Sequence, residues 1–399
     1  MAKALFLSLP LHGHTNPSLP VVRELVARGD QVAYYSTAAF AARIGQTGAV
    51  YRAYPNEFLA DIRQLPERTD ELSWLLMRTT AELLAKLETF RAERADYIVT
   101  DSVAPWGQWI GEALRLPVVT SVSTFAINRH VLAFAVKHGA RPRRAGLVFA
   151  KLRHIAKAIA LGRRLRRTYG VKGPGITGMV FGRSDLNVVY TSREFQPCAD
   201  TFDGRFQFVG ASLAAAPDPE PALPWPEAST DPLVYISLGT LFNADAAFFR
   251  ACVDAFRNES VRVIMSIGTN LSVADLGPLP PNFVVASHVP QLDVLMRAEV
   301  FVTHGGMNSV SESLYHGVPV VVVPQMSEQA MVGGRAEELG AGMCVTKDQA
   351  TPERLRMSVV RLLGDDRYRR QAAVLGQALR TAGGAARAAD VIQKFTRER

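Results

Sequence analysis

Cysteine is scarce in this chain of 399 residues. The three cysteines, Cys198, Cys252 and Cys344, lie far apart in the sequence and lack the spacing of a metal site. An odd and sparse set argues against a disulfide-stabilised secreted protein, because such proteins pair their cysteines densely. The composition therefore predicts a protein of the reducing cytoplasm.

Long apolar runs are missing as well. No stretch of the chain reaches the roughly 18 apolar residues that a membrane-spanning helix needs. The opening residues, MAKALFLSLPLHGH, lack the long apolar segment and the cleavage site of a signal peptide, and we interpret them as a first strand. With 48% hydrophobic residues the chain can bury large cores, and its length favours two or three domains.

Acidic residues are absent between Glu112 and Asp185. Within this gap, segment 131–172 carries twelve basic residues, and without them the net charge of +8 would become −4. These bases alternate with apolar residues near helical spacing. They are Lys137, Arg141, Arg143, Arg144, Lys151, Arg153, Lys157, Arg163, Arg164, Arg166, Arg167 and Lys172.

Two interpretations of segment 131–172 stay open. The favoured one is a helix whose apolar stripe packs on its own domain while the bases face water. The other is a basic amphipathic helix that holds the protein at the inner face of an anionic membrane, each base contributing about 1 kcal/mol near the surface. A nucleic-acid partner is not expected, because the bases are not interleaved with a set of stacking aromatic residues.

The remaining pattern is one of alternating strands and helices. Such alternation predicts an α/β fold with two doubly wound Rossmann-like domains. Strands are expected at 3–9, 31–36, 97–101, 116–122, 187–190 and 206–210, and again at 233–238, 262–267, 282–286, 300–303 and 318–323. The proline-rich stretch 214–231 is a stiff spacer and the best candidate for an interdomain linker. The predicted domains are therefore 1–213 and 232–384, with a C-terminal helix over 385–399.

Residues 301–329 predict an anion site. A buried strand ends at His304, a glycine pair follows, and a helix begins at Met307 and ends before Gly317. The N-terminus of a helix offers free N–H groups and the positive end of the dipole, and glycine lets a ligand approach the backbone closely. Asn308, Ser309 and Glu312 share one face of the helix, so a phosphate above and a ribose below are favoured over a plainly capped helix.

A second group of polar residues lies in the first half. His12 and His14 stand in the loop 10–17 after the first strand, and Asp101 ends the strand 97–101. A histidine in a loop is usually a surface residue, but a carboxylate bonded to one ring nitrogen makes the other a better base. Residues 123–129 follow the strand 116–122 and are expected near the same site.

These motifs together resemble the family 1 glycosyltransferases. The resemblance rests on HGG-x-NS-x-x-E at 304–312, PQ at 324–325 and EQ at 328–329, with VPQ at 289–291, SLGT at 237–240 and HGH-x-NP at 12–17. It implies a glycosyltransferase-B (GT-B) arrangement, in which the two domains face each other across a cleft and a C-terminal helix crosses back onto the first domain. The first domain would bind the acceptor and the second the nucleotide sugar.

The resemblance also implies roles for individual residues. His14 would be the general base and Asp101 the residue that orients it, while His12 is structural. The donor would be bound by Thr240, His288, Val289, Gln291, His304, Gly306, Asn308, Ser309, Glu312, Glu328 and Gln329. At position 288 many relatives have a tryptophan that stacks on uracil. His288 offers less surface, so UDP is only modestly favoured over dTDP.

The expected activity is the inverting transfer of a hexose, such as glucose, from a UDP-sugar to a hydroxyl of an apolar small molecule. Phenols, macrolides and lipids are candidate acceptors, and neither acceptor identity nor oligomeric state follows from the sequence. No cofactor is expected, and no metal, because the chain contains no Asp-x-Asp motif. Two alternatives are a nucleotide-sugar epimerase on the same architecture and a non-catalytic nucleotide-sugar-binding partner of another transferase.

Overall fold

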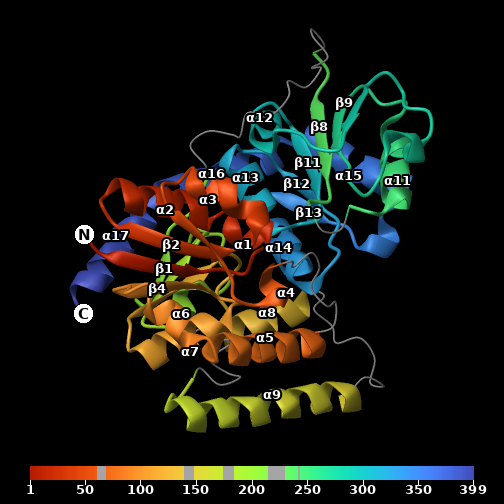
Figure 1. Cartoon of the computed structure of the whole chain (residues 1–399). Coiled ribbons are helices and arrows are strands. Elements are labelled where there is room, and N and C mark those ends of the chain that lie inside the picture. Colours follow the sequence, from red (N-terminus) through yellow and green to blue (C-terminus); the bar gives the residue numbers. More distant parts are fainter. Residues whose placement is uncertain (61–68, 139–147, 174–183, 214–229, 241–242) are drawn as a thin grey trace.

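The computed structural model describes residues 1–60, 69–138, 148–173, 184–213, 230–240 and 243–399. Two parallel sheets, one in each half of the chain, form its framework (Figure 1). In the first sheet the strand order is β3-β2-β1-β4-β5-β6-β7, and in the second it is β10-β9-β8-β11-β12-β13. Most of the predicted linker, 214–229, lies outside the described residues, and the domain boundaries stay a prediction.

The strands of the first sheet are β1 (Lys3–Leu7), β2 (Gln31–Ser36), β3 (Val50–Ala53), β4 (Tyr97–Asp101), β5 (Val118–Val122), β6 (Leu186–Val189) and β7 (Phe206–Phe208). Those of the second are β8 (Leu233–Ser237), β9 (Arg262–Ser266), β10 (Phe283–Ala286), β11 (Val300–Thr303), β12 (Val320–Val322) and β13 (Gly342–Cys344).

The helices of the first half are α1 (His12–Thr15), α2 (Ser18–Ala27), α3 (Ala41–Gly45), α4 (Glu57–Ala60), α5 (Thr69–Leu84), α6 (Leu87–Arg91), α7 (Pro105–Leu114), α8 (Arg129–Lys137) and α9 (Val148–Tyr169). Those of the second half are α11 (Ala246–Phe256), α12 (Gln291–Leu295), α13 (Met307–Tyr315), α14 (Ser327–Glu338), α15 (Pro352–Gly364), α16 (Asp366–Thr381) and α17 (Gly384–Arg397).

Helices cover both faces of each sheet, as is usual for parallel sheets. The first sheet packs α2 and α17 on one face and α5 and α7 on the other. The second packs α11 and α15 on one face and α13 and α16 on the other. Continuous apolar strands such as β8 and β12 follow from this double cover, because no side of them meets water.

The strand order places a topological switch point in each sheet. It lies between β1 and β4 in the first and between β8 and β11 in the second, where successive connections leave toward opposite faces. Ligands of doubly wound sheets bind outside the carboxyl ends of the strands at such points. Both predicted groups of polar residues follow these strands, so the fold collects them where a ligand is expected.

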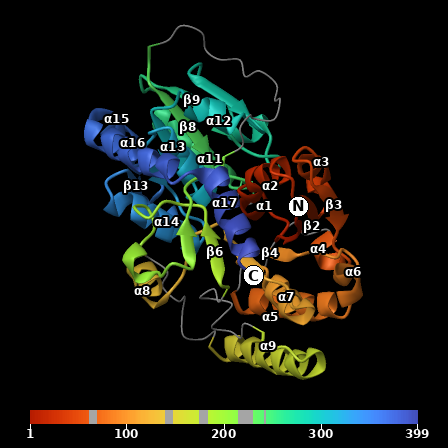
Figure 2. The ribbon, with the colours of Figure 1, turned by 90° about the vertical axis from the view of Figure 1, so that its left-hand side faces the viewer.

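The last helix belongs by packing to the first half of the molecule (Figure 2). Ala389 and Ile392 of α17 lie in the same core cluster as Val22 and Leu25 of α2. At the rim of this contact, Arg28 forms an ion pair with Asp390, at 2.6 Å. The chain therefore returns to the first sheet after completing the second.

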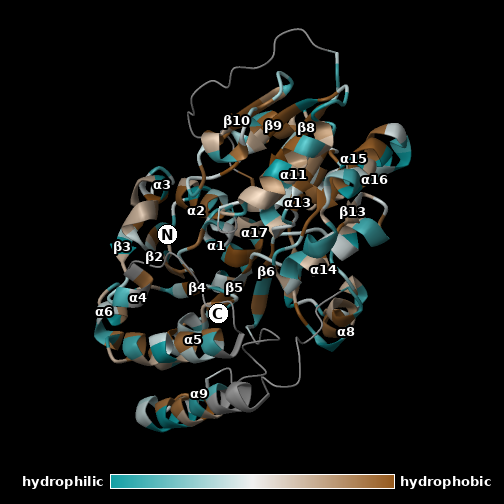
Figure 3. Ribbon diagram, turned by 90° about the vertical axis from the view of Figure 1, so that its right-hand side faces the viewer, coloured by the Kyte–Doolittle hydropathy of each residue, from teal (hydrophilic) through white to brown (hydrophobic). Residues whose placement is uncertain are grey.

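Helix α9 lies at the periphery and packs on α5 (Figures 1 and 3). Ala158 and Leu165 are buried in the cluster that includes Met77 of α5. The bases Lys157, Arg163, Arg164, Arg166 and Arg167 are exposed. Within the described residues, no helix has the length and apolar character needed to cross a membrane.

The predicted α/β fold with two doubly wound sheets is confirmed. Three local features differ from the sequence interpretation. The loop 10–17 contains the one-turn helix α1, and the strands β3 and β13 were not predicted. Both missed strands lie at sheet edges, where β3 is largely exposed and β13 only three residues long, so neither produces a clear apolar signal.

Candidate active site

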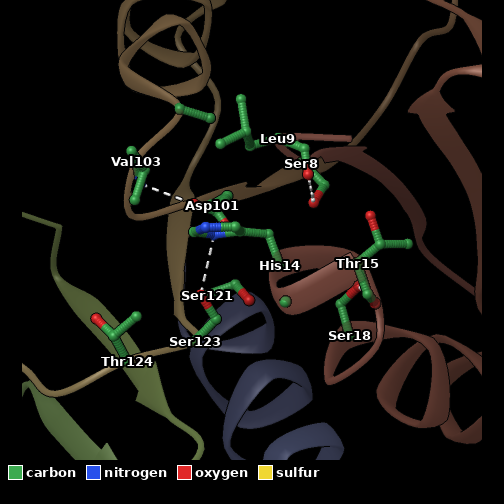
Figure 4. Close-up of polar contacts among 12 residues, drawn as sticks. Ser8, Leu9, His14, Thr15, Ser18, Asp101, Val103, Ser121, Ser123 and Thr124 are labelled. Atoms are coloured by element: carbon green, nitrogen blue, oxygen red, sulfur yellow. Dashed lines mark hydrogen bonds and ion pairs between the residues drawn. The ribbon is translucent and has the colours of Figure 1, made fainter. Parts of the chain in front are cut away.

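The first half brings His14 and Asp101 together, as the sequence predicted (Figure 4). His14 lies on α1, just beyond β1, and Asp101 is the last residue of the adjacent strand β4. His14 Nδ1 lies 2.9 Å from Asp101 Oδ2. The backbone N–H of Val103 donates to Asp101 Oδ1 over 2.7 Å, so both carboxylate oxygens are engaged. The Asp101 side chain is 2% exposed and that of His14 17%, which leaves only the histidine accessible.

This arrangement raises the pKa of His14. Burial alone would lower it, but the negative charge of Asp101 and the hydrogen bond from the imidazole outweigh that effect, and Glu328 adds to the rise. The carboxylate favours the tautomer with hydrogen on Nδ1, so the lone pair of Nε2 is available to accept a proton.

Ser123 also contacts the imidazole, and it is the first of the residues 123–129 that the sequence placed near this site. Its Oγ lies 3.0 Å from His14 Nδ1, and its side chain is buried. Ser123 directly follows β5, the neighbour of β4 in the sheet. Its place after a buried strand indicated that Ser123 lies near the site, but the sequence assigned it no contact with His14.

In the second half, His304 is enclosed by glycines. A Cβ atom added to Gly239 would lie 2.6 Å from its ring, and one added to Gly306 2.5 Å, so only glycine permits this packing. Gly305 has φ +87°, which also favours glycine. Burial lowers the pKa of His304 to about 4, so the ring is a neutral hydrogen-bond partner beside the start of α13.

Gln291 and Glu312 form a hydrogen-bonded pair. Gln291 Nε2 donates to Glu312 Oε2 over 2.5 Å, and its Oε1 accepts from the hydroxyl of Tyr235 over 3.1 Å. Ser309 Oγ lies 3.5 Å from the same amide nitrogen. Burial raises the pKa of Glu312 to about 7, and the hydrogen bond from Gln291 opposes that rise. Gln291 thus holds the carboxylate predicted to bind ribose.

Asn308 connects the two halves. Its side-chain Nδ2 donates to the backbone carbonyl oxygen of Gly13 over 3.1 Å. Close by, residues of both halves line a cavity of about 20 Å³. Its lining is formed by Asn16, Pro17, Tyr190, Ala211, Ser212, Leu213, Asn308, Ser311 and Glu312. The helix start that carries Asn308 therefore lies directly against the turn that carries the histidine.

Glu328 and Gln329 occupy the first turn of α14. Gln329 is buried, and its Oε1 accepts from the backbone N–H groups of Gln325, at 2.8 Å, and Met326, at 3.1 Å. The NH2 group of the same side chain remains available to donate a hydrogen bond to another partner. The Glu328 side chain is exposed at the surface. Partial desolvation by the residues around it raises its pKa, the positive charge of a protonated His14 opposes this rise, and the negative charge of Asp101 adds to it. Glu328 thus lies within electrostatic range of the histidine.

The other predicted donor residues differ in their exposure to solvent. Thr240 and His288 are exposed, and Val289 is buried, so that only its backbone could serve a ligand. Burial lowers the pKa of His12, and the nearby Arg43 and His288 add to this effect, so His288 lies near α1. His12 itself packs against Phe40, with the ring centroids 4.9 Å apart, in keeping with a structural role.

Known proteins with this architecture are numerous. Residues 252–392 match the family described as the erythromycin biosynthesis protein CIII-like, C-terminal domain. The chain is 34% identical to the NDP-glycosyltransferase YjiC of Bacillus licheniformis, over 97% of this chain and 96% of the relative. It is 36% identical to the demethyllactenocin mycarosyltransferase of Streptomyces fradiae, over 98% of this chain and 86% of the relative.

A solved structure supports the same assignment. The calicheamicin glycosyltransferase CalG4 superposes with a TM-score of 0.80 at 31% identity, over 99% of this chain and 98% of that chain. The resemblance drawn from the motifs is thereby confirmed. The chain belongs to the family 1 glycosyltransferases, enzymes of the GT-B fold that transfer sugars.

Proposed function

We propose that this enzyme transfers a hexose from a nucleoside diphosphate sugar to a hydroxyl of an apolar small molecule, with inversion at the anomeric carbon. The observation that carries the proposal is the contact between Asn308 and Gly13, because it sets the helix start suited to a diphosphate beside the turn that holds His14. An acceptor hydroxyl at His14 Nε2 would thus lie close to a sugar whose diphosphate rests on α13.

The chemistry assigned to His14 is general-base catalysis. As the acceptor oxygen bonds to the anomeric carbon, its proton passes to Nε2 and the bond from that carbon to the diphosphate oxygen breaks, leaving the electron pair on phosphate. Asp101 stabilises the imidazolium that forms. A positioned base contributes roughly 10² to 10⁴-fold, which corresponds to about 3–5 kcal/mol of the barrier.

The departing diphosphate needs its growing charge neutralised. The free N–H groups at the start of α13 and the neutral imidazole of His304 are donors suited to this task, with Ser309 and the Thr240 loop beside them. We assign the stabilisation of the leaving group to these protein groups and to no metal ion or cofactor.

The donor is assigned by the residues around that anion site. Glu312 would accept hydrogen bonds from both ribose hydroxyls. The NH2 group of Gln329 and the carboxylate of Glu328 would bind hydroxyls of the sugar. UDP-glucose is the favoured donor, with the backbone of Val289 and the ring of His288 at the base. The relatives named as an NDP-glycosyltransferase and a mycarosyltransferase support a nucleotide-sugar donor and admit more than one sugar.

The acceptor class rests on the relatives. Those named for demethyllactenocin and calicheamicin support a natural product of the polyketide or phenolic kind, and a lipid is a further candidate. The test is the release of UDP from UDP-glucose with and without a panel of phenols, macrolides and lipids. Acceptor-dependent release supports the transferase. An epimerase would convert the sugar nucleotide without releasing UDP, and a non-catalytic binding partner would do neither.

We also propose that the enzyme is a cytoplasmic protein drawn to anionic membranes by the outer face of α9. Arg163, Arg164, Arg166 and Arg167 are exposed there without ion-pair partners among the described residues, and the helix contains no acidic residue. Its buried residues already pack on α5, so the attraction would be electrostatic, without insertion. The bases Arg141, Arg143 and Arg144 of the predicted segment lie outside the described residues.

A further inference from the structure

We propose that Ser123 is a positioning residue for the catalytic base, acting through His14 Nδ1. The proposal rests on the role of His14 proposed above and deepens it. The motifs do not include Ser123, and the sequence placed residues 123–129 near the site without assigning Ser123 a role. What points to it is a buried hydroxyl in hydrogen-bond contact with the ring nitrogen opposite the one that would accept the proton.

The position of Ser123 follows from the sheet. Strands β1, β4 and β5 are consecutive neighbours, and their carboxyl ends reach the same edge. In the register of β4 and β5, Asp101 lies opposite Ser121, so Ser123 stands two residues beyond that pair. The N–H of Ser102 donates to the carbonyl oxygen of Ser121 over 2.9 Å, which ties the two strand ends together. The hydroxyl is therefore presented by rigid backbone.

The contact geometry gives His14 two neighbours on one nitrogen. Nδ1 lies 2.9 Å from Asp101 Oδ2 and 3.0 Å from Ser123 Oγ (Figure 4). Nδ1 carries a single hydrogen, and the negative charge of Asp101 keeps it there, so Ser123 Oγ acts as a second acceptor rather than as a donor. One acceptor alone would let the ring pivot about the Nδ1–H direction. Two acceptors restrict that motion and thereby fix where Nε2 points.

Loss of the hydroxyl has two expected effects. With an aliphatic alcohol as acceptor, Ser123→Ala lowers kcat about five- to tenfold, the size of one hydrogen bond. The acid limb of the pH profile also moves to lower pH, because an acceptor at Nδ1 stabilises the protonated ring and raises its pKa. A purely structural defect would lower activity without moving this limb.

The experiment compares Ser123→Ala, Ser123→Cys and Ser123→Thr in the full chain, with UDP-glucose and an aliphatic alcohol. Thr keeps the hydroxyl and restores kcat and the pH profile, whereas the Cys thiol is a weak acceptor and behaves as Ala does. The matched control is Ser121→Ala, which removes a buried hydroxyl of β5 that bonds Tyr190 at 3.1 Å instead of His14. Circular dichroism confirms that each variant is folded.

Other results would overturn the proposal. An unchanged kcat in both the Ala and Cys variants contradicts it. A loss confined to KM for the nucleotide sugar, with an unmoved pH profile, would make Ser123 a sugar contact. In an Asp101→Asn background the effect of Ser123→Ala should differ from its effect alone, because both groups act on one nitrogen. Full turnover by His14→Ala would refute the proposed base itself, which is distinguishable from a failure of Ser123 alone.

Discussion

The side-chain amide of Asn308 donates a hydrogen bond to the backbone carbonyl oxygen of Gly13 over 3.1 Å. Asn308 lies in the first turn of the helix that would bind the diphosphate, and Gly13 precedes the histidine that would deprotonate the acceptor. The position of His14 is thereby determined from both halves: its ring contacts Asp101 in the first, and its backbone turn contacts α13 in the second. We therefore expect a ligand that shifts α13 to act on His14 as well.

The assignment of His14 predicts a large effect on weak nucleophiles. His14→Ala should lower kcat on an aliphatic alcohol by about 10² or more, while UDP affinity stays near that of the parent enzyme. With an acidic phenol as acceptor kcat should fall less, because the phenol loses its proton more readily. Steady-state kinetics with both acceptors tests this, with His12→Ala as the neighbouring control. Full turnover of the alcohol by His14→Ala would show that the base lies elsewhere.

The raised pKa of His14 predicts a pH dependence. The base acts only when neutral, so kcat/KM should fall as the pH drops through that raised pKa. Asp101→Asn removes the charge that raises it, so the acid limb should move to lower pH while the maximal rate decreases. The pH profile with an aliphatic alcohol measures both effects. An acid limb that stays in place in Asp101→Asn would argue against the pair.

The geometry of Gln329 defines how its sugar contact can be tested. Its Oε1 already holds the backbone of Gln325 and Met326, so Gln329→Ala would disturb that loop as well. Gln329→Glu keeps an acceptor for that backbone and replaces the NH2 donor with a negatively charged carboxylate oxygen. This variant should bind UDP-glucose more weakly and UDP with about the same affinity as the parent enzyme. Calorimetry with both ligands measures the two affinities. Equal losses for both ligands would refute the contact.

Glu312 predicts a proton linked to nucleotide binding. Burial raises its pKa to about 7, so the free enzyme carries a partly protonated carboxyl at neutral pH. Ribose hydroxyls donate to the ionised form, so UDP binding should release protons and weaken as the pH falls below 7. Titrations in two buffers of different ionisation heat measure that release. Glu312→Gln should remove the part of the release that comes from Glu312. The release that remains in this variant measures the protons that the diphosphate itself exchanges. An unchanged release would contradict the assignment.

The exposed arginines of α9 predict salt-sensitive membrane binding. The protein should sediment with anionic vesicles at low salt. At 0.5 M salt it should stay in the supernatant, since exposed charges are screened, and it should also stay there with neutral vesicles. Changing Arg163, Arg164, Arg166 and Arg167 to Gln should abolish sedimentation with anionic vesicles. The control changes Arg354, Arg361, Arg369 and Arg370, four exposed bases of α15 and α16, and should still bind. Absence of binding to anionic vesicles would leave α9 as a helix that simply packs on its domain.

The fold was predictable wherever strands are apolar throughout. Strand β12 was expected within 318–323 and lies at Val320–Val322, where every residue is apolar and buried. The strand pattern placed His14 beyond β1 and Asp101 at the end of β4, at one switch point, and the family resemblance implied that these two residues pair. Contacts between side chains were harder to predict. The hydrogen bond from Gln291 to Glu312 depends on how α12 packs on α13, and the contact of Ser123 with His14 depends on the exact end of β5.

The return of α17 to α2 limits how this enzyme can be recombined with its relatives. A chimera joined only within 214–231 would place a foreign α17 against the native α2, so the residues that replace Ala389 and Ile392 would meet side chains of α2 that did not evolve with them. Exchange of donor specificity therefore calls for a second junction near Gly383, between α16 and α17. The transplanted unit is then an internal segment, inserted into a first domain that keeps both ends of its own chain.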